Sequence, residues 1–431
     1  MNFKTQNIKT NTPLNLLIIL VVFVFLHSCK SGQNASNRNV AGIYMPGINL
    51  IDPSFKVFNK NDSLTQFYFR LNAENLLYTK KRSDSTYTAN VEVTYQLTEK
   101  DQKEIIDSAT LKFVDFGKNN QLKYLDGTLE LATQPNKEYD LIIMFNDINR
   151  DNYLKKRIYI NRLNQFNSQN FLPTDTLGNV IFKNYFNIGD VVELKKNETN
   201  SNNTIALKIY NIVHGIAKPP FSESDTEKKQ DFLPDSIQVL TFDENSKVRL
   251  SILSKGLYHF QSSEINKEGP TFYSFQDNFP SVKSIENMIA PMRYISTKDE
   301  YNKLLEAENQ KVAMDEFWLD IAGSTERART LIKEYFNRVE NANEFFTSYL
   351  EGWKTDRGLI YLIYGTPTVV YKHKDYENWI YGEENNVMSL NFVFYKVKNP
   401  ITNNDYSLSR SSIYKTTWYR AVDTWRSGRI Y

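Results

Sequence analysis

The sequence predicts a multidomain, mainly β protein: two immunoglobulin-like β-sandwich modules, then a C-terminal α+β domain with helices packed on an antiparallel sheet. Three observations lead to this fold class. At 431 residues the chain exceeds the usual size of one hydrophobic core, so two or three domains are expected. Between about residues 41 and 264 apolar residues recur with a period of two, which is typical of strands. After about residue 290 the period becomes that of helices, before strands return.

The N-terminus has the features of an export signal. Lys4 and Lys9 form a weakly basic n-region, and residues 14–26 form an apolar run without charge. That run is too short to span a bilayer comfortably and has the length of a signal-peptide core. It ends at Leu26-His27-Ser28-Cys29, which resembles a bacterial lipobox, where the cysteine is lipidated and starts the mature chain. We therefore expect residues 1–28 to be a lipoprotein signal peptide.

Lipidation of Cys29 would anchor the protein in a membrane. Cys29 is the only cysteine, so the acylated protein has no disulfide and depends on its cores for stability. Because no acidic cluster follows Lys30, the periplasmic face of the outer membrane is favoured over the cell surface. Residues 29–40 are expected to be the acylated cysteine and a flexible tether. The alternative is an ordinary secretory signal with an incidental cysteine.

Residues 41–164 are predicted to form the first β-sandwich-like domain. Phe67, Phe69 and Leu71 alternate with polar residues, and residues 87–97 continue this alternation over one long apolar face. Alternation of this kind is typical of strands with one wet face. Two further apolar segments, 139–145 and 156–160, flank a polar stretch and predict a hairpin.

Residues 165–175 are polar and contain Pro173, so they are predicted to be a linker. Residues 176–264 are predicted to form the second β-sandwich-like domain. The charged segment 223–231 is expected to be an exposed loop, with a partner-binding element as the alternative. The strands expected in this domain are 191–194, 204–213, 236–242, 248–253 and 256–260.

Residues 290–431 are predicted to form the α+β domain. Thr297 precedes two acidic residues, a pattern typical of a helix N-cap, and a second helix is expected to end near Gly323. Apolar spacings of three and four predict a long helix that begins after Ser324 or Thr325. The segment before it, residues 272–295, is expected to be irregular. Strands are then expected at 359–364, 369–371, 378–381, 390–394 and 406–408.

The C-terminal tail, residues 413–431, is expected to contain a short helix, with Trp418, Val422 and Trp425 on one face. Docking of this face on the α+β domain is the simpler interpretation. The alternative is an exposed aromatic and arginine anchor for a partner, because these residue types dominate interface hot spots.

Special residue types gather in Gly352-Trp353-Lys354-Thr355-Asp356-Arg357-Gly358 and in the following Ile363-Tyr364-Gly365-Thr366-Pro367. With residues 335–343 before them and 376–381 and 391–394 after them, these segments resemble the GWxTD domain. That family consists of bacterial envelope proteins that are often lipoproteins. The resemblance covers about residues 295–408. It implies a location and an architecture, because the family has no established enzymatic activity.

The motif residues have an architectural interpretation. Gly352 is expected to have the positive φ that ends a helix, and Gly358 to allow close backbone approach at a strand start. Trp353 is expected to be an apolar anchor, and Thr355 and Asp356 to bond to nearby backbone N–H groups. Arg357 is expected to pair with Glu340, Glu344 or Asp356, and Gly365 and Pro367 to form the exit turn.

Two other interpretations remain open. In an enzyme, Asp356 would be general base or nucleophile, Glu340 or Glu351 the acid, and Arg357 the anion holder. In a binding protein, exposed rings would stack on sugars or grip a peptide. The candidate rings are Trp353, Tyr361, Tyr371, Trp379 and Tyr381.

Composition argues against several function classes. With 52 Lys and Arg against 50 Asp and Glu, the chain has no overall excess of basic charge, so no nucleic acid partner is expected. His214, His259 and His373 are scattered, and no phosphate-binding loop is present, so we expect no metal, no cofactor and no enzyme.

Five Asp-Ser or Asp-Thr triplets resemble acceptors for periplasmic O-glycosylation, and simple turns are the alternative explanation. The acceptor residues are Ser63, Ser85, Ser108, Thr176 and Ser236.

The sequence therefore predicts a non-catalytic outer-membrane lipoprotein that faces the periplasm and acts as an interaction or assembly subunit of a cell-envelope complex for secretion, assembly or uptake. Its expected partners are the membrane, through the lipid on Cys29, and envelope proteins. The two β modules are expected to hold the α+β domain away from the lipid. A periplasmic or surface glycan- or peptide-binding protein is the first alternative, and a hydrolase that uses Asp356 is the second.

Overall fold

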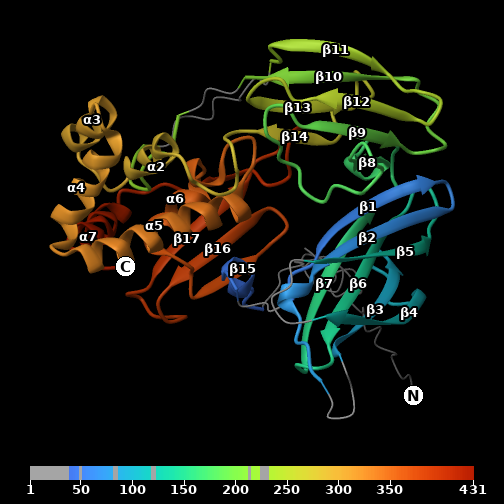
Figure 1. Cartoon of the computed structure of the whole chain (residues 1–431), viewed down its shortest axis with the longest axis horizontal. Coiled ribbons are helices and arrows are strands. Elements are labelled where there is room, and N and C mark those ends of the chain that lie inside the picture. The colour runs from blue at the N-terminus through green and yellow to red at the C-terminus, as the bar shows by residue number, and fades with distance from the viewer. Residues whose placement is uncertain (1–37, 48–50, 81–85, 118–122, 212–214, 224–232) are drawn as a thin grey trace, which may run out of the picture.

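The computed structural model describes residues 38–47, 51–80, 86–117, 123–211, 215–223 and 233–431. Two β-rich units lie one above the other, and the region with most of the helices lies beside them (Figure 1). Several antiparallel sheets followed by helices and a further sheet confirm the predicted fold class. The predicted signal peptide, Cys29, Ser85, His214 and most of the charged loop 223–231 lie outside the described residues.

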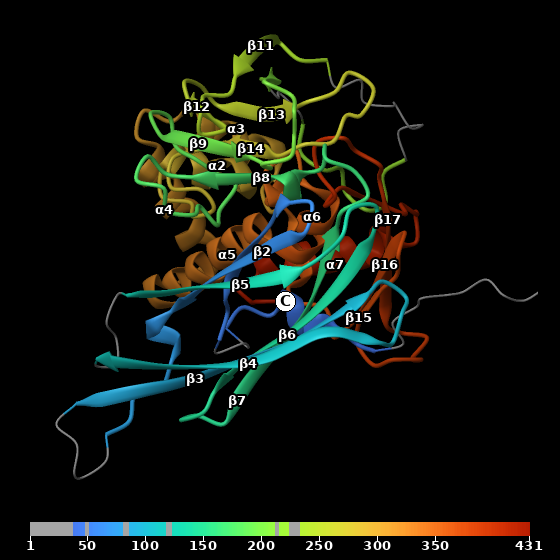
Figure 2. The ribbon, with the colours of Figure 1, turned by 90° about the vertical axis from the view of Figure 1, so that its right-hand side faces the viewer.

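The first unit consists of two antiparallel sheets that share one hydrophobic core. Its elements are β1 (Ser54–Asn61), β2 (Leu64–Asn72), η2 (Ala73–Asn75), β3 (Tyr87–Glu99), β4 (Ile105–Gly117), β5 (Tyr124–Ala132), β6 (Glu138–Asp147) and β7 (Asn152–Asn161). The strand orders are β1-β2-β5 and β4-β3-β6-β7. Phe67, Phe69 and Leu71 are buried, and so are Val91 and Val93, as the alternation predicts. Figure 2 shows β3 and β4 at the end of this unit that is farthest from the second unit.

The second unit also has two antiparallel sheets around one core. Its elements are η3 (Ser168–Asn170), β8 (Phe171–Thr174), β9 (Val191–Lys196), β10 (Thr204–Tyr210), β11 (Ser236–Thr241), β12 (Lys247–Ser251), β13 (Gly256–Gln261) and β14 (Thr271–Ser274). The strand orders are β12-β9-β8 and β11-β10-β13-β14, and the five strands expected from the sequence are all present.

The predicted linker 165–175 is wrong, because it contains η3 and the strand β8. All four residues of β8 are buried, and the strand pairs with β9 and contacts β1 of the first unit. Pro173 is compatible with this position because β8 is an edge strand, where a missing N–H need not interrupt a ladder. The strand was not predicted because polar residues flank its short sequence and its burial depends on tertiary packing.

The C-terminal region contains six helices among its described residues and one antiparallel sheet of order β15-β16-β17-β18. Thr297 caps α3 through a capping box with Glu300, and Gly323 ends α4 at φ 69°, both as predicted. The elements are α2 (Ile285–Met292), α3 (Lys298–Glu306), α4 (Gln310–Ala322), α5 (Thr325–Phe346), η4 (Gly352–Lys354), α6 (Asp356–Tyr364), β15 (Val369–Lys372), β16 (Tyr376–Tyr381), β17 (Leu390–Lys396), β18 (Tyr406–Leu408) and α7 (Tyr414–Arg426).

Two predictions for this region are wrong. The apolar run 359–364 is not a strand but most of α6, whose residues from Arg357 onward are all buried. The helix contacts α5, β18 and α7, so it is apolar on every side, and periodicity cannot distinguish such a run from a strand. The segment 272–295, expected to be irregular, contains most of β14 and all of α2.

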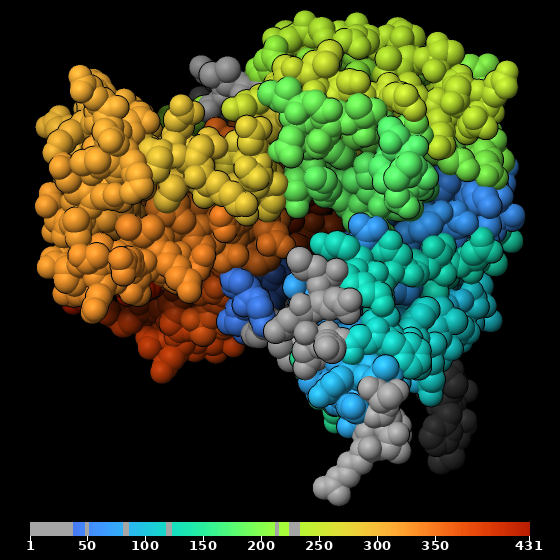
Figure 3. All heavy atoms as spheres, viewed as in Figure 1, coloured from blue at the N-terminus to red at the C-terminus, as the bar shows by residue number. Residues whose placement is uncertain are grey.

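The N-terminal strap, residues 38–45, lies on the C-terminal region and not on the first unit. The N–H of Val40 donates to the carbonyl of Val370 at 2.9 Å, and the side chain of Asn39 accepts from the N–H of Val370 at 3.0 Å. Tyr44, in η1 (Ala41–Tyr44), packs its ring against Phe346 at 4.9 Å between centroids. Figure 3 shows the strap in blue against the C-terminal region. The expectation that the first domain begins near residue 41 is therefore wrong.

Candidate functional site

Two glycines of the motif permit close contacts between backbones. A Cβ on Gly352 would lie 1.8 Å from the carbonyl oxygen of Ala342 in α5, and a Cβ on Gly358 would lie 1.8 Å from the carbonyl oxygen of Gly352. Neither glycine has a positive φ, so the predicted role of Gly352 in ending a helix through positive φ is wrong. The close approach predicted for Gly358 is confirmed, although it occurs at a helix start and not at a strand start.

Thr355 and Asp356 fix the beginning of α6. The hydroxyl of Thr355 accepts from the N–H of Gly358 at 3.1 Å and donates to the carbonyl of Gly352 at 2.8 Å. These are the nearby backbone contacts predicted for Thr355. Asp356 instead accepts from the distant N–H of Leu408 at 2.8 Å and forms an ion pair with Arg410. Asp356 therefore links the helix start to the end of β18 and to the chain that follows it.

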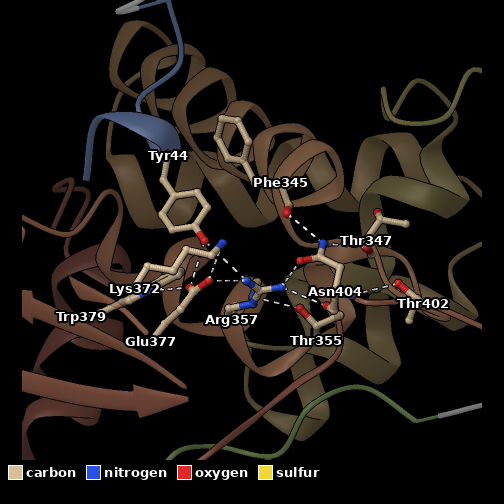
Figure 4. Close-up of polar contacts among 11 residues, drawn as sticks. Tyr44, Phe345, Thr347, Thr355, Arg357, Lys372, Glu377, Trp379, Thr402 and Asn404 are labelled. Atoms are coloured by element: carbon tan, nitrogen blue, oxygen red, sulfur yellow. Dashed lines mark hydrogen bonds and ion pairs between the residues drawn. The ribbon is translucent and has the colours of Figure 1, made fainter. Parts of the chain in front are cut away.

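Arg357 lies at the centre of a buried polar network (Figure 4). Its guanidinium donates to Glu377 at 3.2 Å and to the backbone carbonyl of Asn404 at 2.9 Å. The group also lies 4.0 Å from the ring centroid of Tyr406, a distance typical of a cation–π contact. The predicted pairing of Arg357 with Glu340, Glu344 or Asp356 is wrong, because its ionic partner comes from the neighbouring sheet.

Glu377 is fully buried and has four polar partners. Its carboxylate accepts from Arg357, from Lys372 at 2.9 Å, from the hydroxyl of Tyr44 at 2.9 Å and from the indole of Trp379 at 3.1 Å. Burial alone raises the pKa of the Glu377 carboxyl, but the positive charges of Arg357 and Lys372 lower it more, so the net pKa shift is downward. Burial raises the pKa of the Tyr44 hydroxyl well above its usual value, which keeps it a donor.

The C-terminal residues 256–427 match the GWxTD domain family. This chain contains a GWxTD domain. No curated protein matches the chain. The network of Arg357 and Glu377 therefore lies inside the GWxTD domain and joins its motif to its sheet and to the N-terminal strap.

Solved structures resemble the chain only weakly. A β-glucuronidase of Bacteroides uniformis is 10% identical over 25% of this chain and 12% of its own, with a TM-score of 0.17. A putative β-galactosidase of Bacteroides fragilis is 7% identical over 32% and 19%, with a TM-score of 0.18. Red sea bream transglutaminase is 8% identical over 53% and 32%, with a TM-score of 0.20. The chain spans less than a third of the length of each, and similarities of this size support no inference about activity.

The aromatic residues considered for ligand stacking are mainly core residues of the GWxTD domain. Trp353, Tyr361 and Trp379 are all buried, so the prediction that they expose their rings is wrong. Tyr371 and Tyr381 are partly buried, and the hydroxyl of Tyr381 donates to the carbonyl of Gly365 at 2.8 Å. Trp353, Tyr361 and Trp379 therefore belong to the hydrophobic core of the domain.

The carboxylates considered for catalysis each have a partner of their own. Asp356 pairs with Arg410, Glu340 accepts from the N–H of Val282 at 2.8 Å, and Glu351 pairs with Lys354 at 2.8 Å. Each of these three carboxylates therefore has a partner within the protein. Within the described residues, no group of His, Cys, Asp or Glu has the arrangement of a metal site.

The exit turn of the motif has the predicted components. Gly365 has φ 79°, a value that favours glycine, and its N–H donates to the carbonyl of Tyr361 at 2.8 Å to end α6. Pro367, two residues further on, is buried. The guanidinium of Arg338 lies beside Gly365 and donates to the carbonyl of Ile363 at 3.3 Å.

The tail helix α7 docks on the GWxTD domain, as the simpler interpretation predicted. Trp418 and Trp425 are buried, and the indole of Trp425 donates to the carbonyl of Ile363 at 3.0 Å. Arg426 makes two hydrogen bonds, at 2.8 and 2.9 Å, with the carboxylate of Glu300. The two tryptophans of the alternative aromatic and arginine anchor are therefore not exposed, whereas its Tyr419 is 50% exposed.

The motif residues line neither of two shallow surface depressions on this domain, which measure about 540 and 500 Å³. The larger depression lies on α7 and the smaller on the segments that flank α3. Among the helices of the described residues, none is long and apolar enough to cross a membrane. Four of the candidate glycosylation residues, Ser63, Ser108, Thr176 and Ser236, are exposed.

The sequence analysis missed several partners of the motif. Glu377 had a detectable signal, because it alternates with Trp379 on the inward face of β16, where a carboxylate requires a partner. Tyr44, Asn404 and Arg410 gave no such signal, since their contacts join segments far apart in the sequence. Lys372 lies opposite Glu377 on the neighbouring strand, and this contact depends on the register between β15 and β16.

Proposed function

We propose that the protein is an outer-membrane lipoprotein, facing the periplasm, that acts as a non-catalytic interaction or assembly subunit of a cell-envelope complex. The polar residues of the GWxTD motif support a structural role for the motif, because they are engaged inside the domain. An interaction role then requires a surface elsewhere on the molecule.

The observation that carries this proposal is the edge strand β4. Within the described part of the chain, only β3 pairs with β4, so the other edge of this thirteen-residue strand has no strand partner. Its outward face includes Ile106, Val114 and Phe116, and Phe116 is 64% exposed. A long edge strand with apolar side chains is a template for the addition of a strand from another protein. We infer that a partner of the envelope complex pairs with β4 in this way.

A pull-down with matched edge variants tests the proposal. The tagged protein is recovered in mild detergent from the membranes of its own cells, and the co-purifying proteins are identified. The test variant combines Val114→Lys and Phe116→Lys, since lysine on an edge strand opposes strand addition. The control is Val239→Lys on β11, a second exposed edge strand of only six residues.

We expect the unchanged protein and the β11 control to recover an envelope protein in stoichiometric amount, and the β4 variant to lose it. Recovery of the protein alone would contradict the assembly role. Equal loss in both variants would contradict the assignment to β4. Lipid attachment is tested separately by fractionation and fatty-acid labelling, where Cys29→Ser is expected to release the protein from the membrane.

A further inference from the structure

The turn that joins β16 to β17, residues 382–389, exposes two apolar side chains almost completely. Val387 is 99% exposed and Met388 is 90% exposed. Neighbouring apolar residues on a surface mark a contact with a partner or a membrane more often than a single one does.

Hydrogen bonds within the turn hold its backbone in one conformation, and this conformation determines the direction of the two side chains. The N–H of Met388 donates to the side chain of Asn386 at 2.9 Å, and the N–H of Ser389 donates to the carbonyl of Asn386 at 3.0 Å. The hydroxyl of Ser389 donates to the carbonyl of Glu383 at 2.7 Å, and the hydroxyl of Tyr371 donates to Glu384. The turn therefore holds Val387 and Met388 outward, away from the core.

The N-terminal strap reaches the same edge of the sheet. Its chain runs from Val40, which bonds to Val370, back to Asn39, whose amide donates to the carbonyl of Thr368 at 3.0 Å. The hydroxyl of Thr368 accepts from the N–H of Gly382 at 3.3 Å, at the base of the turn. The strap thus enters the GWxTD domain beside the turn that holds the two exposed apolar residues.

The distance from this point to the proposed lipid is short. Ten residue steps separate Cys29 from Asn39, and a fully extended chain spans at most about 33–36 Å over that length. The lipid on Cys29 would therefore hold this edge of the GWxTD domain close to the membrane. The sequence-based expectation was the opposite, with the two β units between the lipid and this domain.

We propose that the turn 382–389 is a membrane contact, in which Val387 and Met388 enter the interface of the phospholipid surface to which the protein is anchored. This inference rests on the proposed lipid anchor. Glu383 and Glu384 lie on the same turn, so the contact depends on apolar insertion and not on attraction to anionic lipids. Acyl chains and an apolar tip together provide two attachments, which orient the GWxTD domain on the membrane.

An environment-sensitive fluorophore tests the proposal on the full lipidated protein in phosphatidylcholine vesicles. Because Cys29 is the only natural cysteine and is acylated in this protein, Met388→Cys provides a unique attachment point. The matched control is Val239→Cys on β11, which is also exposed but belongs to the second β unit. Co-flotation with the vesicles reports the lipid anchor, and the emission and iodide quenching of the label report insertion of the turn.

The label on Met388 is expected to shift its emission to shorter wavelengths and to lose iodide quenching several-fold on vesicles, while the label on Val239 stays unchanged. Failure to float would contradict the lipid anchor itself. Flotation with a water-like label at Met388 would overturn the membrane contact alone. An emission shift that requires an added envelope protein, and is absent on vesicles, would also overturn it in favour of a protein partner.

Discussion

The centre of the GWxTD domain buries charged side chains, whereas the outer edge of the first β unit exposes apolar ones. In the domain centre, the charges of Arg357 and Glu377 are buried and satisfied by partners inside the protein. At the edge, the apolar side chains of Val114 and Phe116 are exposed, and the outer side of β4 lacks a strand partner among the described residues.

This difference separates the buried polar contacts of the motif from the surface that we propose for contact with a partner. A buried ion pair has a high desolvation cost, which it recovers only when every partner is present, so its removal affects folding. Exposed apolar side chains on an edge strand contribute little to the stability of the isolated protein, so their alteration affects association. The motif therefore stabilises the domain, whereas the edge strand is available for contact.

The largest expected effect comes from breaking the buried pair. Arg357→Met removes the buried counter-ion of Glu377 and leaves its carboxylate with only the partly exposed Lys372, and we expect the free energy of unfolding of the GWxTD domain to fall by about 3–5 kcal/mol. All five tryptophans of the chain lie between Trp318 and Trp425, within this domain. Tryptophan fluorescence during urea unfolding therefore reports this domain separately from the β units.

The matched control combines Arg357→Met with Glu377→Met, which removes both charges. We expect the double variant to recover part of the loss, because no uncompensated charge remains buried. A single Arg357→Met variant with the stability of the unchanged protein would contradict the structural role of the network.

A smaller effect is expected at the ion pair between Glu300 and Arg426, which fixes α7. The hydrogen bonds from Arg426 lower the pKa of Glu300 from its usual value of 4.5 to about 2. Since the folded pKa is the lower one, the stabilisation is fully present above about pH 4.5 and is lost as the pH falls through about 2. The side chains of Arg426 and Glu300 are 31% and 36% exposed, so solvent screening keeps the contribution within about 1 kcal/mol.

This pH dependence is measured as the difference in unfolding free energy between the unchanged protein and Glu300→Gln. The difference is expected to stay constant from pH 6 to about 4.5 and then to shrink as the pH falls towards about 2. A difference that stays constant below about pH 4.5 as well would show that ionisation of Glu300 does not contribute.

The smallest effect on stability is expected at β4. Combined Val114→Lys and Phe116→Lys should change the free energy of unfolding by no more than about 0.5 kcal/mol per site, as is usual for exposed positions. Because the first β unit has no tryptophan, far-ultraviolet circular dichroism is the suitable measurement. A large loss of stability would show that these side chains belong to the fold, and would weaken their assignment to a partner.

Local patterns in the sequence were sufficient for most of the elements. Alternation in β2 and β3 predicted which residues are buried, because the period of a strand is a property of the backbone alone. Thr297 and Gly323 predicted helix ends for the same reason, since capping depends on residues within one turn. The resemblance to the GWxTD domain was also contained in the order of residues along the chain.

Sequence patterns failed where burial on all sides or long-range contact decided the outcome. The run 359–364 is apolar on every side because α5, β18 and α7 surround its helix, so its pattern does not show a helical period. Strand β8 is buried because the first unit packs against it. The sequence predicted that Arg357 pairs with a carboxylate. Its partner is Glu377 because β16 lies beside α6 in the folded chain.

The sequence by itself determined the fold class, the family of the C-terminal domain and most strand and helix positions, because these depend on periodicity and on short motifs. Only the tertiary structure decided that the strap around Tyr44 closes on the GWxTD domain, that Asp356 and Arg357 have different partners, and that Val387 and Met388 are exposed beside the strap. These features depend on which distant segments meet, and contacts of that kind are fixed by packing of the whole chain.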